Sequence, residues 1–261
     1  MNRAESSRRI GLARALSKRG YCSRSKAFDL IRAGRVTLND GICRDPEAPV
    51  HSERDRIKVD GEELAPQAKL YLMLNKPRGV VTTASDEKGR ETVYACLDEH
   101  FPWVAPVGRL DKASEGLLLL TNDSEWAARV LAPETHLDKT YHVQIGAVAD
   151  GALIESITKG TRIDDGNLLR AKGVQILRGG AKNTWLEIVL DEGKNRQIRR
   201  MLSQLGINVL RLLRVAIGPV RLGDLPKGAS RPLTDTERLA LDRAMRQASA
   251  DRGRGLRRRR R

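Results

Sequence analysis

A charged loop bracketed by two glycines is the first stretch whose composition suggests chemistry. Residues 108–116 are Gly-Arg-Leu-Asp-Lys-Ala-Ser-Glu-Gly, and the apolar run 117–120 follows directly. Such a loop can present the Asp111 carboxylate at the edge of a sheet, where partial desolvation and a nearby cation would adjust its acidity. Aspartates in glycine-flanked loops also serve as turn formers or helix caps. The loop alone therefore predicts either a catalytic carboxylate or a turn.

A second stretch gathers arginines at one end of an expected helix. Residues 192–201 are Glu-Gly-Lys-Asn-Arg-Gln-Ile-Arg-Arg-Met, and apolar residues at helical spacing form an inner face. Arg196, Arg199 and Arg200 then lie near the helix N-terminus on its exposed or cleft-facing side. Guanidinium groups in this position can bind phosphates or hold a carboxylate in a bidentate pair. A solvated arginine face is the alternative.

A third stretch places an aromatic ring on an expected strand. Residues 139–143 are Lys-Thr-Tyr-His-Val, and Tyr141, Val143 and Ile145 share one face of an alternating segment. A tyrosine on a strand usually belongs to the core. This pattern by itself does not distinguish a core ring from a ring that contacts a ligand.

The segments around these stretches predict a mixed α+β domain from residue 69 onward. Alternation over 70–75 is typical of a half-buried strand, and the apolar run over 116–121 is typical of a central strand. Helical periodicity covers 125–131 and 195–205, and Thr-Asp-Thr-Glu at 234–237 is a capping box that opens a last helix. Because strands and helices do not alternate strictly, a mixed sheet flanked by helices is favoured over a doubly wound sheet.

The N-terminal residues predict a separate module of two helices followed by short strands. Apolar spacing indicates a first helix that Gly20 ends and a second helix that Ser23 caps and Gly34 ends. Short strands at 36–38 and 57–59 are each followed by a tight turn containing Asp-Gly. The module is therefore small and begins with its helices.

Basic side chains crowd the helical part of this module. Residues 10–36 contain seven of them against a single acid, Asp29. A solvated helix face usually mixes charges of both signs, so the bias favours a phosphate-binding surface. A basic face that serves only solubility is the alternative. The seven residues are Arg14, Lys18, Arg19, Arg24, Lys26, Arg32 and Arg35.

The overall composition favours a polyanionic partner over a metal or a membrane. Lys and Arg outnumber Asp and Glu by 48 to 33, which gives a net charge of +15, and an excess of this size favours nucleic acid. Three widely spaced cysteines and four histidines fit neither a disulfide framework nor a zinc site. No long apolar run and no signal peptide is evident, so we expect a soluble cytoplasmic protein.

The three stretches, in this order and spacing, resemble the signature motifs of the pseudouridine synthases. The matching segments are GRLDKASEGLLLLTND, KTYHVQI and EGKNRQIRRM, preceded by Asn-Lys-Pro-Arg-Gly at 75–79. The resemblance is to the branch typified by the ribosomal small-subunit synthase and its large-subunit relatives. Residues 12–61 resemble an S4 RNA-binding domain, which many members carry in front. Together the similarity extends over residues 12–245.

The resemblance implies a reaction and a set of roles. These enzymes break the N-glycosidic bond of uridine, turn the base and rejoin it through C5, without a cofactor or metal. Asp111 falls on the catalytic aspartate, Tyr141 on the tyrosine that lies against the target base, and Arg199 on the basic residue that pairs with the aspartate. Basic residues in and around the motifs are expected to bind RNA, namely Lys76, Arg78, Arg109, Lys194, Arg196 and Arg200.

Departures from the family pattern bear on the substrate. Ser114 stands where Thr is common, which keeps a hydroxyl group. Asn195 and Arg196 stand where the small-subunit enzyme has Tyr-His, and Arg199 stands where that enzyme has Lys. These features are closer to the large-subunit relatives, so 23S RNA is favoured over 16S RNA.

The resulting expectation is a two-domain monomer that acts on ribosomal RNA or on a precursor of a ribosomal subunit. The expected boundaries are a basic extension at 1–9, an S4 domain at 10–64, a linker at 65–68, a catalytic domain at 69–248 and a disordered arginine-rich tail at 249–261. The alternatives are a non-catalytic S4-type RNA-binding or ribosome-assembly factor and an RNA glycosylase that releases the base.

Overall fold

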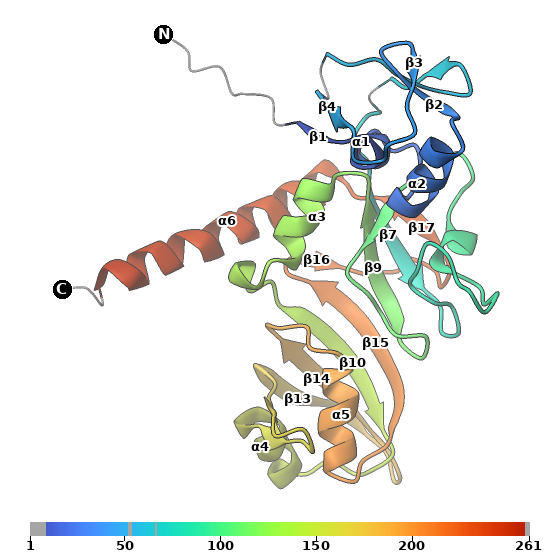
Figure 1. The fold of residues 1–261 in the computed structure, drawn as a ribbon. Coiled ribbons are helices and arrows are strands. Elements are labelled where there is room, and N and C mark those ends of the chain that lie inside the picture. Colours follow the sequence, from blue (N-terminus) through green and yellow to red (C-terminus); the bar gives the residue numbers. More distant parts are fainter. Residues whose placement is uncertain (1–8, 52–53, 66, 259–261) are drawn as a thin grey trace. The chain divides into compact units, whose positions relative to one another are not determined.

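The structure is a computed structural model that describes residues 9–51, 54–65 and 67–258, with side chains up to residue 247. The chain divides into two compact units, and most of their elements are labelled in Figure 1. The first contains the residues up to Tyr71 together with 98–105 and 121–124, and the second contains the remainder from Leu72. Most of the extension expected at 1–9 lies outside the described residues. No helix in the described part of the chain has the length and apolar character needed to cross a bilayer.

The first unit contains two short helices and a small antiparallel sheet. Helix α2 is capped by the side chain of Ser23, which accepts a hydrogen bond from the Lys26 amide at 3.2 Å, as predicted. The sheet has the strand order β3-β2-β5-β6, and β1 pairs separately with β4. The bounds are β1 Ile10–Gly11, α1 Leu12–Lys18, α2 Arg24–Arg32, β2 Val36–Leu38, β3 Gly41–Ile42, β4 Pro49–Val50, β5 Ile57–Val59 and β6 Glu62–Glu63.

Both predicted tight turns of this unit are confirmed. Asn39 and Asp40, with φ of 51° and 68°, connect β2 to β3, and Asp60 and Gly61, with φ of 51° and 88°, connect β5 to β6. Two consecutive positive φ angles are the geometry that matches the twist of a two-residue hairpin, and Asn, Asp and Gly tolerate it best. The helices and the sheet then share one apolar core, which includes Leu12, Leu16, Ile31, Val36 and Ile57.

The second unit is built on a mixed, largely antiparallel sheet of nine strands within the described residues. Its main order is β13-β14-β10-β15-β9-β7-β17, with β16 beside β15 and β8 beside β9. Strands β15 and β9 are parallel, whereas β10 is antiparallel to both β14 and β15. The bounds are β7 Tyr71–Lys76, β8 Ala105–Val107, β9 Glu115–Thr121, β10 Lys139–Ile145, β13 Gly173–Gly179, β14 Thr184–Leu190, β15 Val209–Ile217, β16 Val220–Arg221 and β17 Ser230–Pro232.

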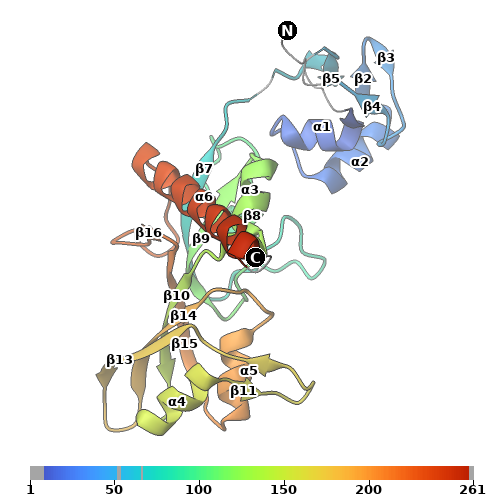
Figure 2. The same cartoon turned by 90° about the vertical axis from the view of Figure 1, so that its left-hand side faces the viewer.

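Helices α4 (Gly151–Lys159) and α5 (Gln197–Gln204) lie on the same side of strands β13, β14, β10 and β15 (Figure 2). Their apolar faces pack on Val143 and Ile145 of β10 and on Leu186 of β14, all without exposed surface. A short hairpin of β11 (Thr161–Arg162) and β12 (Leu168–Leu169) lies between α4 and β13 in the chain. The predicted face of β10, with Tyr141, Val143 and Ile145 together, is confirmed by this packing.

Two expectations about the second unit are wrong. The half-buried strand predicted at 70–75 is buried on both faces, since Leu72, Met73 and Leu74 have no exposed surface; the strand lies inside the sheet between β9 and β17. The disordered tail predicted from residue 249 is replaced over 249–258 by the end of helix α6, Asp235–Arg258. Six of the ten residues in 249–258 are Ala, Leu or Arg, which are favourable helix formers, so the charge of this segment does not prevent a helix.

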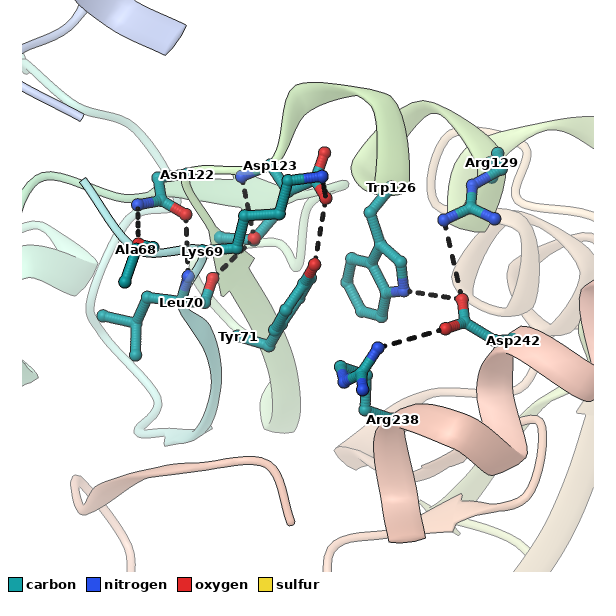
Figure 3. Close-up of polar contacts among 11 residues, drawn as sticks. Ala68, Lys69, Leu70, Tyr71, Asn122, Asp123, Trp126, Arg129, Arg238 and Asp242 are labelled. Atoms are coloured by element: carbon teal, nitrogen blue, oxygen red, sulfur yellow. Dashed lines mark hydrogen bonds and ion pairs between the residues drawn. The ribbon is translucent and has the colours of Figure 1, made fainter. Parts of the chain in front are cut away.

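The Thr-Asn-Asp sequence at the end of β9 fixes the start of β7 (Figure 3). The Asn122 side chain donates a hydrogen bond to the Ala68 carbonyl at 2.9 Å and accepts one from the Leu70 amide at 2.8 Å. Asp123 accepts a hydrogen bond from the Tyr71 hydroxyl at 2.9 Å. These side chains therefore hold the chain segment that follows the expected linker and set the register at which β7 begins.

Helices α3 (Ser124–Leu131) and α6 meet at a buried carboxylate, that of Asp242 (Figure 3). Asp242 is 6% exposed and accepts a hydrogen bond from the Trp126 indole at 3.2 Å. Its oxygens also lie 3.6 Å from the Arg129 guanidinium and 3.5 Å from that of Arg238. The capping box predicted at the start of α6 is confirmed, because Thr234 and Glu237 bond each other's backbone amides at 2.8 and 3.1 Å.

Replacement of Asp242 by Asn should destabilise the fold. The neutral amide would lose its attraction to the Arg129 and Arg238 guanidinium groups and weaken the hydrogen bond that the buried Trp126 indole donates, at a cost of about 1–3 kcal/mol. Urea unfolding followed by circular dichroism measures this free energy. Asp224→Asn, at an exposed loop position, is the matched control and should change it by less than about 0.5 kcal/mol. Equal effects of the two variants would contradict a special role for the buried carboxylate.

Candidate active site

The Asp111 loop is held through its backbone by residues that lie far from it in the sequence. Lys76, at the end of β7, has no exposed surface, and its ammonium donates hydrogen bonds to the carbonyl groups of Pro77 at 3.0 Å, Asp111 at 3.2 Å and Ser114 at 2.9 Å. The Thr82 hydroxyl donates to the Leu110 carbonyl at 2.8 Å. The main chain on both sides of Asp111 is therefore held in place by contacts that do not involve the Asp111 side chain.

The Asp111 carboxylate itself is uncommitted. The side chain is partly exposed and makes no hydrogen bond or ion pair with the residues that the structure describes. A carboxylate in a fixed loop, without an internal partner, keeps both oxygens for a ligand. An aspartate that only formed the turn would bind nearby backbone amides with its side-chain oxygens. The free carboxylate therefore favours the other interpretation of this loop, a carboxylate that acts on a ligand.

Arg199 reaches the same loop from α5. Its Nη2 donates to the Ala113 carbonyl at 3.0 Å and its Nη1 to the Val209 carbonyl at 3.4 Å, while its buried Nε has no partner among the described residues. Burial, and then the nearby Arg196, lowers the pKa of Arg199, and the Asp111 carboxylate partly offsets this. Arg199 is therefore close enough to Asp111 for their charges to interact. Its guanidinium, however, is hydrogen-bonded to the loop backbone and not to the carboxylate.

Tyr141 lies on the α5 side of the sheet, directly opposite Arg214 in the pairing of β10 with β15. Its ring is partly exposed and packs against the core under α4 and α5. Arg214 is 6% exposed, donates from Nε to the Leu117 carbonyl at 2.7 Å, and has a buried Nη2 without a partner in the described part of the chain. A buried donor without an acceptor costs free energy, so Arg214 has a guanidinium nitrogen available to a ligand. The sequence interpretation missed this residue.

A close approach of two backbones aligns the loop with β15. Gly116 pairs with Arg214 in the parallel contact of β9 with β15, and it has a φ of 99°. A Cβ atom at this position would lie 2.3 Å from the Arg214 carbonyl oxygen. Only glycine satisfies both conditions, so the glycine that ends the charged loop is required by the sheet.

Glu115 adds a buried ion-pair cluster that sequence reasoning also missed. Its carboxylate, in a residue only 2% exposed, lies 3.2 Å from Arg211 and 2.7 Å from Lys227. Burial alone would raise the pKa of Glu115, but hydrogen bonds from Lys227 and Arg211 hold it below its usual value. The three residues are widely separated in the sequence, so no local pattern signals the cluster.

A pocket of about 310 Å³ opens beside the N-terminal turn of α5. It is lined by Arg196, Arg199 and Arg200, which the sequence placed together, and by acidic residues of the β11–β12 hairpin. Arg200 forms an ion pair with Asp165 of this hairpin. The predicted arginine cluster therefore faces a cavity. The described residues contain no group of three or more His, Cys, Asp or Glu side chains placed to hold a metal ion.

The residues expected to bind RNA differ in availability. The expectation that Lys76 binds RNA is wrong, because the side chain is fully buried and its ammonium donates hydrogen bonds to backbone carbonyls. Arg19 is half-buried and donates to the Leu64 and Asp55 carbonyls, and Arg35 and Lys194 are paired with Asp60 and Glu192. The exposed residues of the set include Arg14, Arg24, Lys26, Arg32, Arg78, Arg109 and Arg196.

The buried charge of Lys76 predicts a specific pH dependence of stability. Burial lowers the pKa of Lys76 from 10.5 to about 8, against the opposing effect of the Cys96 thiol and the carboxylates of Asp111 and Glu115. Between these two pH values the unfolded chain holds a proton that the folded chain has lost, so raising the pH relieves the cost of burying the charge.

We therefore expect the native protein to gain stability relative to Lys76→Met as the pH rises from 8 to 10. Urea unfolding of both proteins across this range measures the difference. Lys112→Met, at an exposed position in the same loop, should show no such change relative to the native protein. A difference between the native protein and Lys76→Met that stays constant with pH would contradict a lowered pKa.

Comparison with known proteins bears on the fold and the family of the chain. The family model described as RNA pseudouridylate synthase matches residues 70–204, and the S4 domain model matches residues 10–57. A solved structure titled "Crystal structure of pseudouridylate synthase" has 29% sequence identity and a TM-score of 0.62, over 89% of this chain and 99% of that one. The expected fold class, an S4 module followed by a pseudouridine synthase domain with a mixed sheet, is confirmed.

Curated relatives match over most of their length. An uncharacterized RNA pseudouridine synthase of Aquifex aeolicus is 38% identical over 90% of this chain and 95% of its own. The ribosomal large subunit pseudouridine synthase B of Bacillus subtilis is 34% identical over 87% of this chain and 93% of its own. These matches show that the chain belongs to the RNA pseudouridylate synthase family and is a pseudouridine synthase with an S4 domain.

Proposed function

We propose that this pseudouridine synthase acts on uridine in the RNA of the large ribosomal subunit, with Asp111 as its catalytic carboxylate. The observation that carries the assignment of Asp111 is the contrast between its backbone and its side chain. The loop backbone is held by Lys76, Thr82 and Arg199, while the carboxylate has no partner among the described residues. Positioning a reactive group in advance in this way lowers the entropic cost of reaction.

The reaction is an isomerisation in which atoms balance without a co-reactant. The bond between N1 and C1′ of uridine breaks, the base turns, a bond forms between C5 and C1′, and C5 loses its proton while N1 gains one. Asp111 acts on the ribose or the base as a nucleophile, or stabilises a glycal-forming step. Tyr141 lies against the base, which must leave its stack to reach the carboxylate. Arg199 holds the loop beside the carboxylate through its hydrogen bond to the Ala113 carbonyl.

The choice of substrate rests on relatives and on the motif details. Proteins named ribosomal large subunit pseudouridine synthase B from Bacillus subtilis and Shigella flexneri are 34% and 33% identical to this chain. The Asn195-Arg196 sequence and Arg199 favour the same assignment. We place the S4 domain at 10–64, the linker at 65–68 and the catalytic domain from 69, boundaries supported by family matches over 10–57 and 70–204. Action as a monomer in the cytoplasm stays a prediction.

Tritium release from ribosomal RNA labelled at uridine C5 tests the proposal. The native protein should release tritium and form pseudouridine in large-subunit RNA, and Asp111→Asn should lose this activity by at least about 10³-fold, because the amide cannot act as a nucleophile. Asp224→Asn, at an exposed loop position of the same unit, is the control and should keep full activity.

Four other outcomes would each overturn a part of the proposal. Full activity of Asp111→Asn would remove the carboxylate from the mechanism. RNA binding without tritium release by the native protein would favour an assembly factor, and free uracil would indicate a glycosylase. Activity confined to small-subunit RNA would refute the substrate but leave the chemistry intact.

The S4 module should contribute a salt-dependent part of RNA affinity through its unpaired cations. Arg24 is exposed at the start of α2 and has no partner among the described residues, whereas Arg35 is paired with Asp60. If Arg24 contacts a phosphate, Arg24→Ala should flatten the plot of log affinity against log salt by about 0.7–0.9. Arg35→Ala should have a smaller effect. Identical slopes for the native protein and Arg24→Ala in a filter-binding titration would exclude this contact.

A further inference from the structure

We propose that the pocket beside α5 is a binding site for an RNA backbone phosphate, and that Asp165 occupies this site on Arg200 until RNA displaces it. The proposal rests on the proposed function for the identity of the RNA. It adds the chemical group that the pocket binds and a carboxylate that competes for it.

The composition of the pocket points to an anion of moderate size. Three arginines of the α5 turn line it, together with Ser203 and Gln204. Its volume of about 310 Å³ is at the lower end of the range for ligand pockets, and arginines in its lining favour an anion such as phosphate. A phosphate with its sugar, rather than a whole base stack, is therefore the fitting occupant.

The position of Arg199 links this pocket to the catalytic loop. Arg199 lines the pocket and also donates a hydrogen bond to the carbonyl of Ala113, two residues after Asp111. A ligand that contacts Arg199 from the pocket side is therefore one side chain away from the loop. The phosphate in question should belong to a nucleotide that flanks the target uridine.

Arg196 provides a cation in the pocket that no carboxylate engages. It is exposed, and it has no hydrogen bond or ion pair with the described residues through its side chain. Its backbone has a φ of 49° at the N-cap of α5, a conformation that costs a residue with a side chain about 1 kcal/mol or more. The strained backbone holds this free guanidinium at the pocket rim, which is consistent with a function in binding.

Asp165 is placed to imitate the phosphate. Its Oδ2 pairs with Arg200, and its Oδ1 accepts a hydrogen bond from the Asn167 amide at 3.0 Å, so its own turn holds the carboxylate toward the pocket. The bond from Asn167 and the one from Arg200 lower the pKa of Asp165, and the group therefore stays ionised at neutral pH. The side chains of Arg200 and Asp165 are 35% and 45% exposed, so the pair is weak and exchangeable.

The consequence is selectivity against RNA that binds by charge alone. An RNA that does not place a phosphate in the pocket meets a carboxylate there and leaves Arg200 paired with Asp165. An RNA that fits exchanges the carboxylate for a phosphate and frees Asp165 to solvent. The Asp165 carboxylate thereby weakens the binding of non-specific RNA more than the binding of an RNA that fits the pocket.

Binding of fluorescent RNA to the full chain, followed by anisotropy over a range of salt concentrations, tests the proposal. The probes are a single-stranded oligouridylate of 20 nucleotides and a large-subunit ribosomal RNA transcript. Asp165→Asn should bind the oligouridylate about 3–10-fold more tightly at low salt and steepen the salt dependence by about 0.7, because one more arginine becomes available to phosphate. Arg200→Ala should weaken binding of both RNAs.

Two comparisons separate the proposal from a simple charge effect. Asp164→Asn removes the same charge from the same pocket, but Asp164 pairs with no arginine among the described residues, so its effect should stay below twofold. The double variant Asp165→Asn with Arg200→Ala should match Arg200→Ala alone, because Asp165 acts through Arg200. Equal gains for Asp164→Asn and Asp165→Asn, additive effects in the double variant, or no gain for Asp165→Asn would each overturn the proposal.

The outcome is independent of the catalytic assignment. These measurements record binding without turnover, so they decide the role of Asp165 even if Asp111→Asn proves active. Conversely, loss of tritium release in Asp111→Asn with unchanged binding in Asp165→Asn would support the catalytic site and refute the phosphate site. The melting temperature of each variant should stay close to that of the native protein, because the substituted positions are partly exposed. This measurement excludes misfolding as the cause of a change in binding.

Discussion

The buried ammonium of Lys76 is the contact on which the geometry of the site depends. A charge removed from water is costly unless hydrogen bonds replace its hydration, and here the acceptors are three backbone carbonyls, two of them in the loop that carries Asp111. The loop must keep its conformation for the buried lysine to be tolerated, and the lysine must be present for the loop carbonyls to keep their hydrogen-bond donor. This mutual requirement fixes the backbone at Asp111, while its carboxylate has no partner among the described residues.

The sheet supplies the second constraint, because it brings α5 and the loop to the same side. The parallel contact of β9 with β15 places Gly116 against Arg214, at a distance that admits no Cβ atom. Arg214 in turn faces Tyr141 across the next pair of strands, and Arg199 bridges from α5 to the loop. The positions of Asp111, Tyr141 and Arg199 thus depend on contacts among four separate segments of the chain.

The cations of the protein divide into structural and available groups. Lys76 and Arg19 use their charge on backbone carbonyls, and Arg35 is neutralised by a neighbouring aspartate. Arg24 and Arg196 are exposed and have no such partner in the part of the chain that the structure describes. Residue type determines that a side chain carries a charge, but burial and pairing determine whether RNA can use it, so a net charge of +15 overstates the surface offered to phosphate.

The sequence by itself determined those features that depend on neighbouring residues in the chain. Hairpin turns at Asn39-Asp40 and Asp60-Gly61, the cap at Ser23 and the box at 234–237 are local, and the ordered motifs indicated the family and the α+β class. Tertiary structure alone decided that β7 is buried on both faces, that Lys76 is a structural rather than an RNA-binding residue, and that Glu115 joins Arg211 and Lys227. It also placed Asp165 opposite Arg200. Each of these depends on segments that are distant in the chain, and burial and ion pairing arise only when folding brings such segments together.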